Sequence, residues 1–334
     1  MTRLRINRQM AAWARLRRGR RHRHSGTQEH RRGPVTHVVV LDGTMSTLRP
    51  GCETNAGLTW KLLAAGGPRA SLSLWYEAGV QWPHWTSTHE VIAGRGTNRR
   101  IERAYGFLAS RYRPGDRIFL FGYSRGAFAV RSLAGLIDRV GLLQADHATV
   151  RNVSQAYRHY RYTPDSAAAA AFRRAYCHDG VHIEMVGVWD TVKALGLRLP
   201  LLWRLTEPTY AFHNHALGPH VRRGYHALAF DETRLAYAPE LWETGEGVAA
   251  DIEQRWFPGS HADVGGQLMG RHWARPLSNL PLVWMLEKAE AAGLELPEGW
   301  RAQFPCDPEA RPVGSWRGWG KLFMLRGRRR VGQD

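Results

Sequence analysis

Short apolar runs alternate with helical stretches through the middle of the chain, and this alternation restricts the possible folds more than any other feature. The runs that predict strands are 36–41, 71–76, 117–121, 182–188 and 252–257. The stretches that predict helices are 53–65, 98–112, 125–140, 150–160, 167–176, 220–230 and 277–292. Strands that alternate with helices at this spacing form a parallel sheet with helices on both faces. We therefore expect an α/β fold with a mostly parallel sheet.

The chain is long enough for one large domain. Of its 334 residues, 43% are apolar, which suffices to bury a sizeable core. We expect this domain at 34–310, with a lid-like insertion at 195–218, where Pro, Trp and His interrupt the pattern. No apolar run reaches about 18 residues, so no transmembrane helix is expected. The N-terminus lacks the apolar core of a signal peptide and the three cysteines lie far apart, which favours synthesis in the cytoplasm.

Most of the positive charge lies in two terminal segments. The chain has a formal net charge of +18, of which residues 1–33 contribute +10 and residues 311–334 contribute +6. Basic tails of this kind bind polyanions, or stay solvated without a specific partner. We predict a disordered arm at 1–33 and a basic tail at 311–334. Peripheral contact with an anionic membrane is favoured over contact with nucleic acid. Export of the protein without a signal peptide stays open.

The strongest local signal is the pentapeptide Gly122-Tyr123-Ser124-Arg125-Gly126, between a predicted strand and a predicted helix. It matches the pattern G-x-S-x-G of a nucleophile elbow, in which a serine lies on a sharp strand-to-helix turn. Gly122 and Gly126 suit this turn because larger side chains would collide with the neighbouring backbone. The alternative is a glycine-flanked turn without chemistry. The context between strand and helix favours Ser124 as a nucleophile.

A serine nucleophile needs an oxyanion hole made of backbone N–H groups. One donor is expected from Arg125, the residue after the nucleophile. The second is expected from the turn after the first strand, where Gly43 or Thr44 would present its amide. Asp42 precedes them, and three roles stay open for it: hydrogen bonding to the loop amides, holding the elbow, or binding a cation.

An acid and a histidine are expected to complete a triad, in the chain order serine, acid, histidine. Asp190 follows the strand 182–188, which places it at the same sheet edge as Ser124. His261 follows the last predicted strand, in a loop of small residues. Asp263 competes with Asp190 for the role of the acid. The position of Asp190 directly after a strand favours Asp190. The simpler, non-catalytic explanations are that the Asp190 carboxylate caps a turn and that the His261 imidazole stabilises its loop.

Six segments together resemble one known family in their order and spacing. They are 42–44, 113–118, 121–128, 187–192, 226–232 and 257–266. The family is the α/β-hydrolase catalytic domain of type VI secretion phospholipase effectors. The resemblance implies an α/β-hydrolase fold and an esterase or lipase activity, with glycerophospholipids as the best-known substrates. It also implies the triad roles of Ser124, Asp190 and His261.

The sequence departs from this family in two ways. Met45-Ser46 stands where an aromatic residue usually follows the Asp-Gly-Thr turn. We also expect neither the long insertions nor the large C-terminal membrane module of the toxic effectors. These differences leave the natural substrate open.

The resulting hypothesis is a serine hydrolase that cleaves carboxylic esters through an acyl-enzyme, as a lipase or phospholipase. This chemistry requires neither a metal nor an organic cofactor. In the lid-like segment, Leu201, Leu202 and Trp203 would suit an acyl chain, or would only pack inside the lid. Two alternatives stay open: an inactive hydrolase fold that binds polyanions through its basic arms, and a hydrolase of small soluble esters or thioesters.

Overall fold

A computed structural model of the chain describes residues 32–79, 95–192, 216–243, 250–316 and 325–329. The predicted arm at 1–33 and the predicted lid-like segment at 195–218 lie almost entirely outside these residues, as do Leu201, Leu202 and Trp203. The fold described below is that of the unit formed by residues 34–334.

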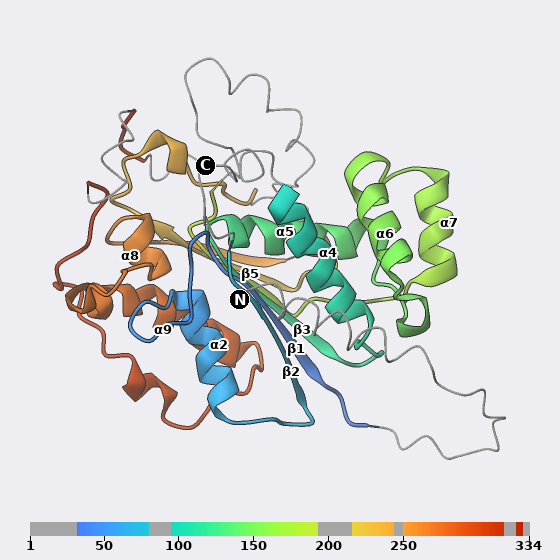
Figure 1. The fold of residues 1–334 in the computed structure, drawn as a ribbon, viewed down its shortest axis with the longest axis horizontal. Helices are drawn as coiled ribbons and strands as arrows, with labels where there is room; N and C mark the ends of the chain where they lie inside the picture. Colours follow the sequence, from blue (N-terminus) through green and yellow to red (C-terminus); the bar gives the residue numbers. More distant parts are fainter. Residues whose placement is uncertain (1–31, 80–94, 193–215, 244–249, 317–324, 330–334) are drawn as a thin grey trace, which may run out of the picture. The chain divides into compact units, whose positions relative to one another are not determined.

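Six parallel strands form one sheet in the described part of the chain (Figure 1). They are β1 (Thr36–Leu41), β2 (Leu72–Glu77), β3 (Arg117–Tyr123), β4 (Met185–Trp189), β5 (Arg223–Ala229) and β6 (Asp251–Phe257). Their spatial order is β2-β1-β3-β4-β5-β6, and every neighbouring pair is parallel. The strand order reverses between β1 and β3. In such sheets, reactive groups gather at the carboxyl ends of the strands.

The helices of the described residues follow most of the predicted stretches. They are α2 (Asn55–Ala65), α4 (Arg95–Ala109), α5 (Arg125–Val140), α6 (Val150–Tyr162), α7 (Ala167–Tyr176), α8 (His261–Gly265) and α9 (Arg275–Ala291). Short 3-10 helices occur at Ala145–His147, Leu235–Tyr237, His272–Ala274 and Trp300–Gln303. The side chains of Thr54, Thr149 and Ser166 cap α2, α6 and α7. These caps satisfy backbone N–H groups that have no partner within the helix.

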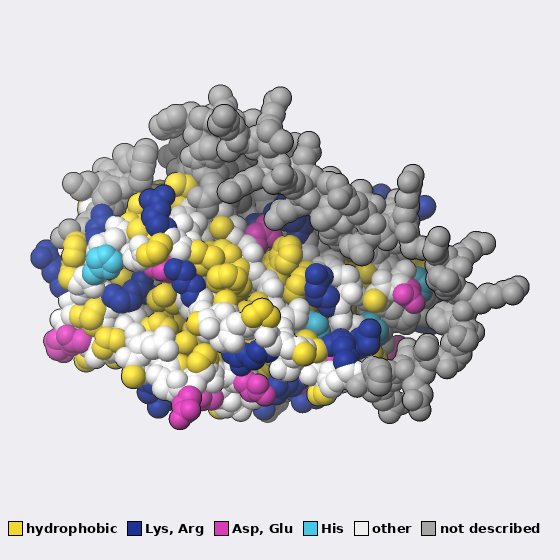
Figure 2. Space-filling model, turned by 60° about the horizontal axis from the view of Figure 1, so that its bottom comes forward, with side chains coloured by type: hydrophobic (Ala, Val, Ile, Leu, Met, Phe, Trp, Pro, Cys, Tyr) yellow, Lys and Arg dark blue, Asp and Glu magenta, His cyan; other side chains and the backbone are white. Residues whose placement is uncertain are grey.

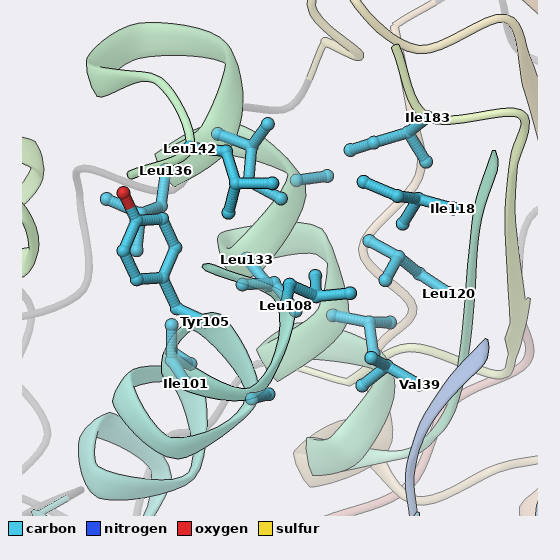
Figure 3. Close-up of a cluster of buried hydrophobic side chains, with 14 of the residues drawn as sticks. Val39, Ile101, Tyr105, Leu108, Ile118, Leu120, Leu133, Leu136, Leu142 and Ile183 are labelled. Carbon is cyan, nitrogen blue, oxygen red and sulfur yellow. The ribbon is translucent and has the colours of Figure 1, made fainter. Parts of the chain in front are cut away.

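Each face of the sheet has its own layer of helices (Figure 1). On one face, strand residues such as Val39, Ile118 and Leu120 pack against side chains of α4 and α5 (Figure 3). On the other face, the alternate strand residues Val38 and Phe119 pack against α2 and α9. Successive strand residues point to opposite faces, so the central strands are buried on both sides. The predicted parallel sheet with helices on both faces is confirmed.

The segment 220–230, predicted as a helix, instead contains strand β5. This strand pairs with β4 on one side and with β6 on the other. All its residues from Gly224 to Ala229 are buried. An apolar run that is buried on both faces shows no alternation, so its periodicity does not distinguish a strand from a helix. Pairing with two neighbouring strands determines the structure here, and it outweighs local propensity.

The described surface carries charges of both signs. On the face that Figure 2 shows, basic side chains are scattered among apolar and acidic ones. None of the described helices combines the length and the apolar character that crossing a membrane requires.

Candidate active site

Strand β3 runs into helix α5 through a turn that has Ser124 at its centre. The backbone of Ser124 has φ 56° and ψ −122°, which is rare for a residue with a Cβ atom. A Cβ at Gly126 would lie 2.0 Å from the carbonyl oxygen of Leu41, and a Cβ at Gly122 would lie 2.6 Å from that of Gly126. Both positions therefore require glycine. Strained backbone of this kind is concentrated at functional sites.

His261 is the side chain that meets Ser124. Its Nε2 lies 2.9 Å from Oγ of Ser124, and its Nδ1 lies 2.6 Å from Oδ2 of Asp190. All three residues are buried. The structure thus brings the three residues indicated by the sequence into one chain of hydrogen bonds.

The backbone of His261 begins helix α8, whereas the sequence predicted a loop. Ser260 precedes this helix, and its N–H and hydroxyl donate to the Asp263 carboxylate at 2.9 and 2.8 Å. A carboxylate that reaches back in this way fixes the start of a helix. The rings of Tyr123 and Tyr237 lie on the imidazole, with centroid distances of 4.9 and 4.8 Å. These contacts hold the imidazole in one orientation.

Asp263, the alternative acid, has other partners. Besides Ser260, its carboxylate accepts hydrogen bonds from the N–H groups of Val313 and Gly314, at 2.7 and 3.1 Å. Asp263 therefore fastens residues 313–314 to α8, while the Nδ1 of His261 is held by Asp190.

Asp190 follows β4 directly and has a positive φ of 40°. Besides the contact with His261, its carboxylate accepts hydrogen bonds from the N–H of Ala229 at 2.9 Å and from both terminal nitrogens of Arg329. Its own N–H donates to a neighbouring strand, at Ala227, over 2.7 Å. The N–H of Ser124 donates in the same way to the carbonyl at the end of β4, over 3.0 Å. The hydrogen bonding of the sheet thus continues into the site.

Arg329 is a site residue that the sequence analysis did not find. Its Nη1 and Nη2 face the two carboxylate oxygens of Asp190, at 2.5 and 2.9 Å. Its side chain is only 5% exposed. In the sequence it is one of several arginines in a basic tail, and no local pattern distinguishes it from Arg328, which is exposed.

Charges around the site give the acid and the histidine different protonation states. Burial alone would raise the pKa of Asp190, but the charge of Arg329 and the hydrogen bonds from His261 and Arg329 bring it well below its ordinary value. Burial lowers the pKa of His261, and the contact with Asp190 offsets only part of this effect. At neutral pH the site therefore holds an ionised carboxylate beside a neutral imidazole. A neutral Nε2 is able to accept a proton from Ser124.

The turn after β1 lies beside the elbow. The amide of Gly43 donates to the Asp42 carboxylate at 2.6 Å, so this N–H is already used and Thr44 is the better candidate in the turn. The side chain of Gln267 donates to the carbonyl oxygen of Thr44 at 2.8 Å and holds the turn in place. Arg125, the other predicted donor, is the first residue of α5.

Asp42 fastens this turn to its surroundings. The hydroxyls of Thr54 and Tyr76 donate to its carboxylate at 2.8 and 2.7 Å, and Arg100 donates to its carbonyl oxygen at 2.8 Å. Burial raises the pKa of Asp42, against the lowering effect of these hydroxyls. Of the roles left open by the sequence, the hydrogen bond from the Gly43 amide matches bonding to the loop amides. Among the residues that the structure describes, no three His, Cys, Asp or Glu side chains are grouped to hold a metal ion.

Solved structures of two proteins resemble the fold at low identity. One is an uncharacterised protein from Pseudomonas aeruginosa, with a TM-score of 0.44 and 15% identity, over 83% of this chain and 49% of that one. The other is the Tle1 effector bound to the VgrG spike of the type VI secretion system, with a TM-score of 0.34 and 16% identity, over 73% of this chain and 55% of that one.

Sequence comparison gives closer matches. The uncharacterised protein YEL023C of Saccharomyces cerevisiae is 28% identical in an alignment of 232 residues that covers 61% of this chain and 34% of that protein. The chain therefore spans about a third of the length of the yeast relative. A family model described as the catalytic domain of Tle1-like type VI secretion phospholipase effectors matches residues 36–288. This match covers most of the chain and all three residues of the hydrogen-bonded site, and the chain belongs to this family of Tle1-like phospholipase effector catalytic domains.

Proposed function

We propose that the protein is a serine hydrolase that cleaves carboxylic esters of lipids, with Ser124 as the nucleophile, His261 as the base and Asp190 as the acid that orients it. Membership of the family supports a lipase or phospholipase activity in general. The finer assignment rests on the hydrogen-bonded chain from Asp190 through His261 to Ser124, with distances of 2.6 and 2.9 Å. This chain ends at the strained serine of the elbow.

The proposed reaction proceeds in two halves. First, Nε2 of His261 removes the hydroxyl proton of Ser124 while Oγ attacks the ester carbonyl carbon. Nδ1–H stays bonded to Asp190, whose negative charge stabilises the imidazolium. The amides of Arg125 and Thr44 are the proposed donors to the oxyanion. The leaving alcohol takes the proton from His261, and water then cleaves the acyl-enzyme by the same route.

Exposed apolar side chains near the site favour a lipid over a small soluble ester. Met45 follows the proposed oxyanion turn, Phe230 follows β5 and Met269 follows α8, and all three are exposed. Each belongs to a segment that leaves the sheet edge at which Ser124 and His261 lie. Exposed apolar side chains beside a reactive site are typical of a surface that binds an apolar partner.

Labelling with a fluorophosphonate, followed by a lipid panel, tests this proposal. The wild type should be labelled, Ser124→Ala should not, and the wild type should release fatty acid from glycerophospholipid vesicles. Labelling with hydrolysis of only short soluble esters or thioesters would reject the lipid substrate and keep the serine mechanism. Absence of labelling, combined with salt-dependent binding of polyanions, would reject the enzyme.

A further inference from the structure

We propose that Arg329 is a positioning residue of the active site, and that residues 325–329 form a strap that delivers its guanidinium to Asp190. The inference rests on the proposed function, because it concerns the group that holds the proposed acid. It gives a specific role to one arginine of the basic C-terminal tail.

Each of the two terminal nitrogens of Arg329 donates to two acceptors. Nη1 donates to Oδ1 of Asp190 at 2.5 Å and to the carbonyl oxygen of Ala229 at 2.7 Å. Nη2 donates to Oδ2 of Asp190 at 2.9 Å and to the carbonyl oxygen of Tyr237 at 2.5 Å. A two-pronged contact of this kind fixes the plane of a carboxylate as well as its position. Because Oδ2 also accepts from His261, that plane determines where the imidazole points.

Contacts along the strap place Arg329 at the site. The N–H of Gly327 donates to the carbonyl oxygen of Thr233 at 2.8 Å, and an antiparallel bridge joins Arg326 to Arg234. The side chain of Arg326 donates to the hydroxyls of Thr233 and Ser315, at 2.9 and 3.1 Å. The strap thus lies along the segment that follows β5.

Burial distinguishes the pair of Arg329 and Asp190 from a surface ion pair. Their side chains are 5% and 0% exposed. Exposed pairs are screened by solvent and contribute little, whereas a buried carboxylate that loses its partner is left with an uncompensated charge. Without Arg329, the carboxylate would keep the Ala229 amide and His261 as partners, and its plane would be held less firmly.

Titratable and charged groups from several elements surround His261. Asp190 follows β4, and Tyr123 ends β3. The segment after β5 contributes Glu232, Arg234 and Tyr237, and the strap contributes Arg329. Glu232 accepts the backbone N–H of His261 at 3.2 Å and also pairs with Arg234, so these two charges offset each other. The positive charge of Arg329 offsets the negative charge of Asp190 in the same way. Removal of Arg329 would leave a net negative charge beside the imidazole, which favours the imidazolium and raises the pKa of His261.

The test compares Arg329→Met, Arg329→Lys and the matched control Arg328→Met, which removes the same charge from an exposed neighbouring position. Circular dichroism and thermal melting first establish that each variant is folded. Then kcat and KM for a soluble p-nitrophenyl ester are measured across pH. For Arg329→Met we expect kcat to fall about 10- to 100-fold with little change in KM, because a misplacement of a reacting group by about 1 Å costs roughly 10²-fold in rate.

The pH profile separates positioning from a merely structural role. In Arg329→Met the midpoint of the acid limb of kcat/KM should rise by roughly 1 pH unit, since one positive charge has left the site. Arg329→Lys keeps the positive charge but loses the two-pronged contact with the carboxylate. The acid limb of this variant should therefore stay near that of the wild type, and its kcat should fall less than that of Arg329→Met. Arg328→Met should match the wild type in both quantities.

An unchanged kcat and an unchanged acid limb in folded Arg329→Met would overturn the inference. An equal effect of Arg328→Met would do the same, because tail charge alone would then be responsible. If Arg329→Met does not fold, Arg329→Lys and Arg326→Met decide the question, and wild-type kcat in both would overturn it. Fluorophosphonate labelling keeps the two proposals apart: an unlabelled wild type rejects the proposed function, whereas a labelled wild type with unaffected Arg329 variants rejects only the strap.

Discussion

Replacing Gly126 with alanine should disable the site while leaving most of the fold in place. The added Cβ would lie 2.0 Å from the carbonyl oxygen of Leu41 and 2.6 Å from that of Asp42. Ordinary contact begins at 3.4 Å, so the shorter distance falls 1.4 Å below it. Both oxygens belong to the backbone and cannot turn aside as a flexible side chain can. The elbow or the end of β1 must therefore move.

A movement of this size is large compared with the tolerances of the site. Oγ of Ser124 lies 2.9 Å from Nε2 of His261, and a hydrogen bond is lost beyond about 3.5 Å. A misplacement of about 1 Å costs roughly 10²-fold in rate, so kcat/KM should fall by at least about 100-fold. Overpacking should also lower the free energy of unfolding by about 1–3 kcal/mol.

The assay is hydrolysis of a p-nitrophenyl ester, with urea unfolding of the same samples. Gly106→Ala, in helix α4, is the matched control because its Cβ would meet Val153 at 3.7 Å, an ordinary contact. Alanine in a helix interior stabilises by roughly 0.5–1 kcal/mol relative to glycine, so this variant should be active and slightly more stable. Near-wild-type kcat/KM in folded Gly126→Ala would refute the idea that backbone packing at the elbow positions the nucleophile.

Three further predictions concern the nucleophile, the base and the N-terminal arm. Ser124→Ala should lower ester hydrolysis by about 10³-fold or more without loss of fold; full activity in steady-state kinetics would reject the mechanism. Because burial lowers the pKa of His261 from its ordinary 6.5, hydrolysis should persist at pH 6.5 and decline only in more acidic solution; a half-maximal rate above pH 6.5 would contradict this sign. A chain that starts at Pro34 should match the full chain on a soluble ester but be less active on phosphatidylglycerol vesicles at low salt, since each basic residue near an anionic surface contributes about 1 kcal/mol and salt screens it. Equal activity on such vesicles would remove the membrane role of the arm.

The elbow could be predicted because its requirements are local. A strand, a tight turn and a helix follow one another within a few residues. Gly122 and Gly126 indicate that the backbones approach each other too closely for larger side chains. Asp190 and His261 could be indicated because both follow strands, and strand ends of a parallel sheet share an edge. In both cases a short stretch of sequence carries the necessary information.

The parts that the sequence did not reveal depend on contacts between distant segments. Strand β5 is buried on both faces, so its identity depends on the strands beside it. The role of Arg329 depends on the docking of the strap backbone at Thr233 and Leu235, far away in the chain, and the tail 311–334 contains five other arginines. The use of the Gly43 amide by the Asp42 carboxylate depends on a turn geometry that residue types alone do not specify.

The N–H groups of Ser124 and Asp190 both donate to carbonyl oxygens of neighbouring central strands. Breaking these bonds requires the sheet to open, so both amide hydrogens should exchange with solvent only on global unfolding. The strap at 325–329 is joined to the domain near Thr233, and the amide of Gly327 should exchange through local opening instead. We therefore expect the amide hydrogens of the nucleophile and the acid to exchange more slowly than the amide hydrogen of Gly327, on the strap that carries the cation beside the acid.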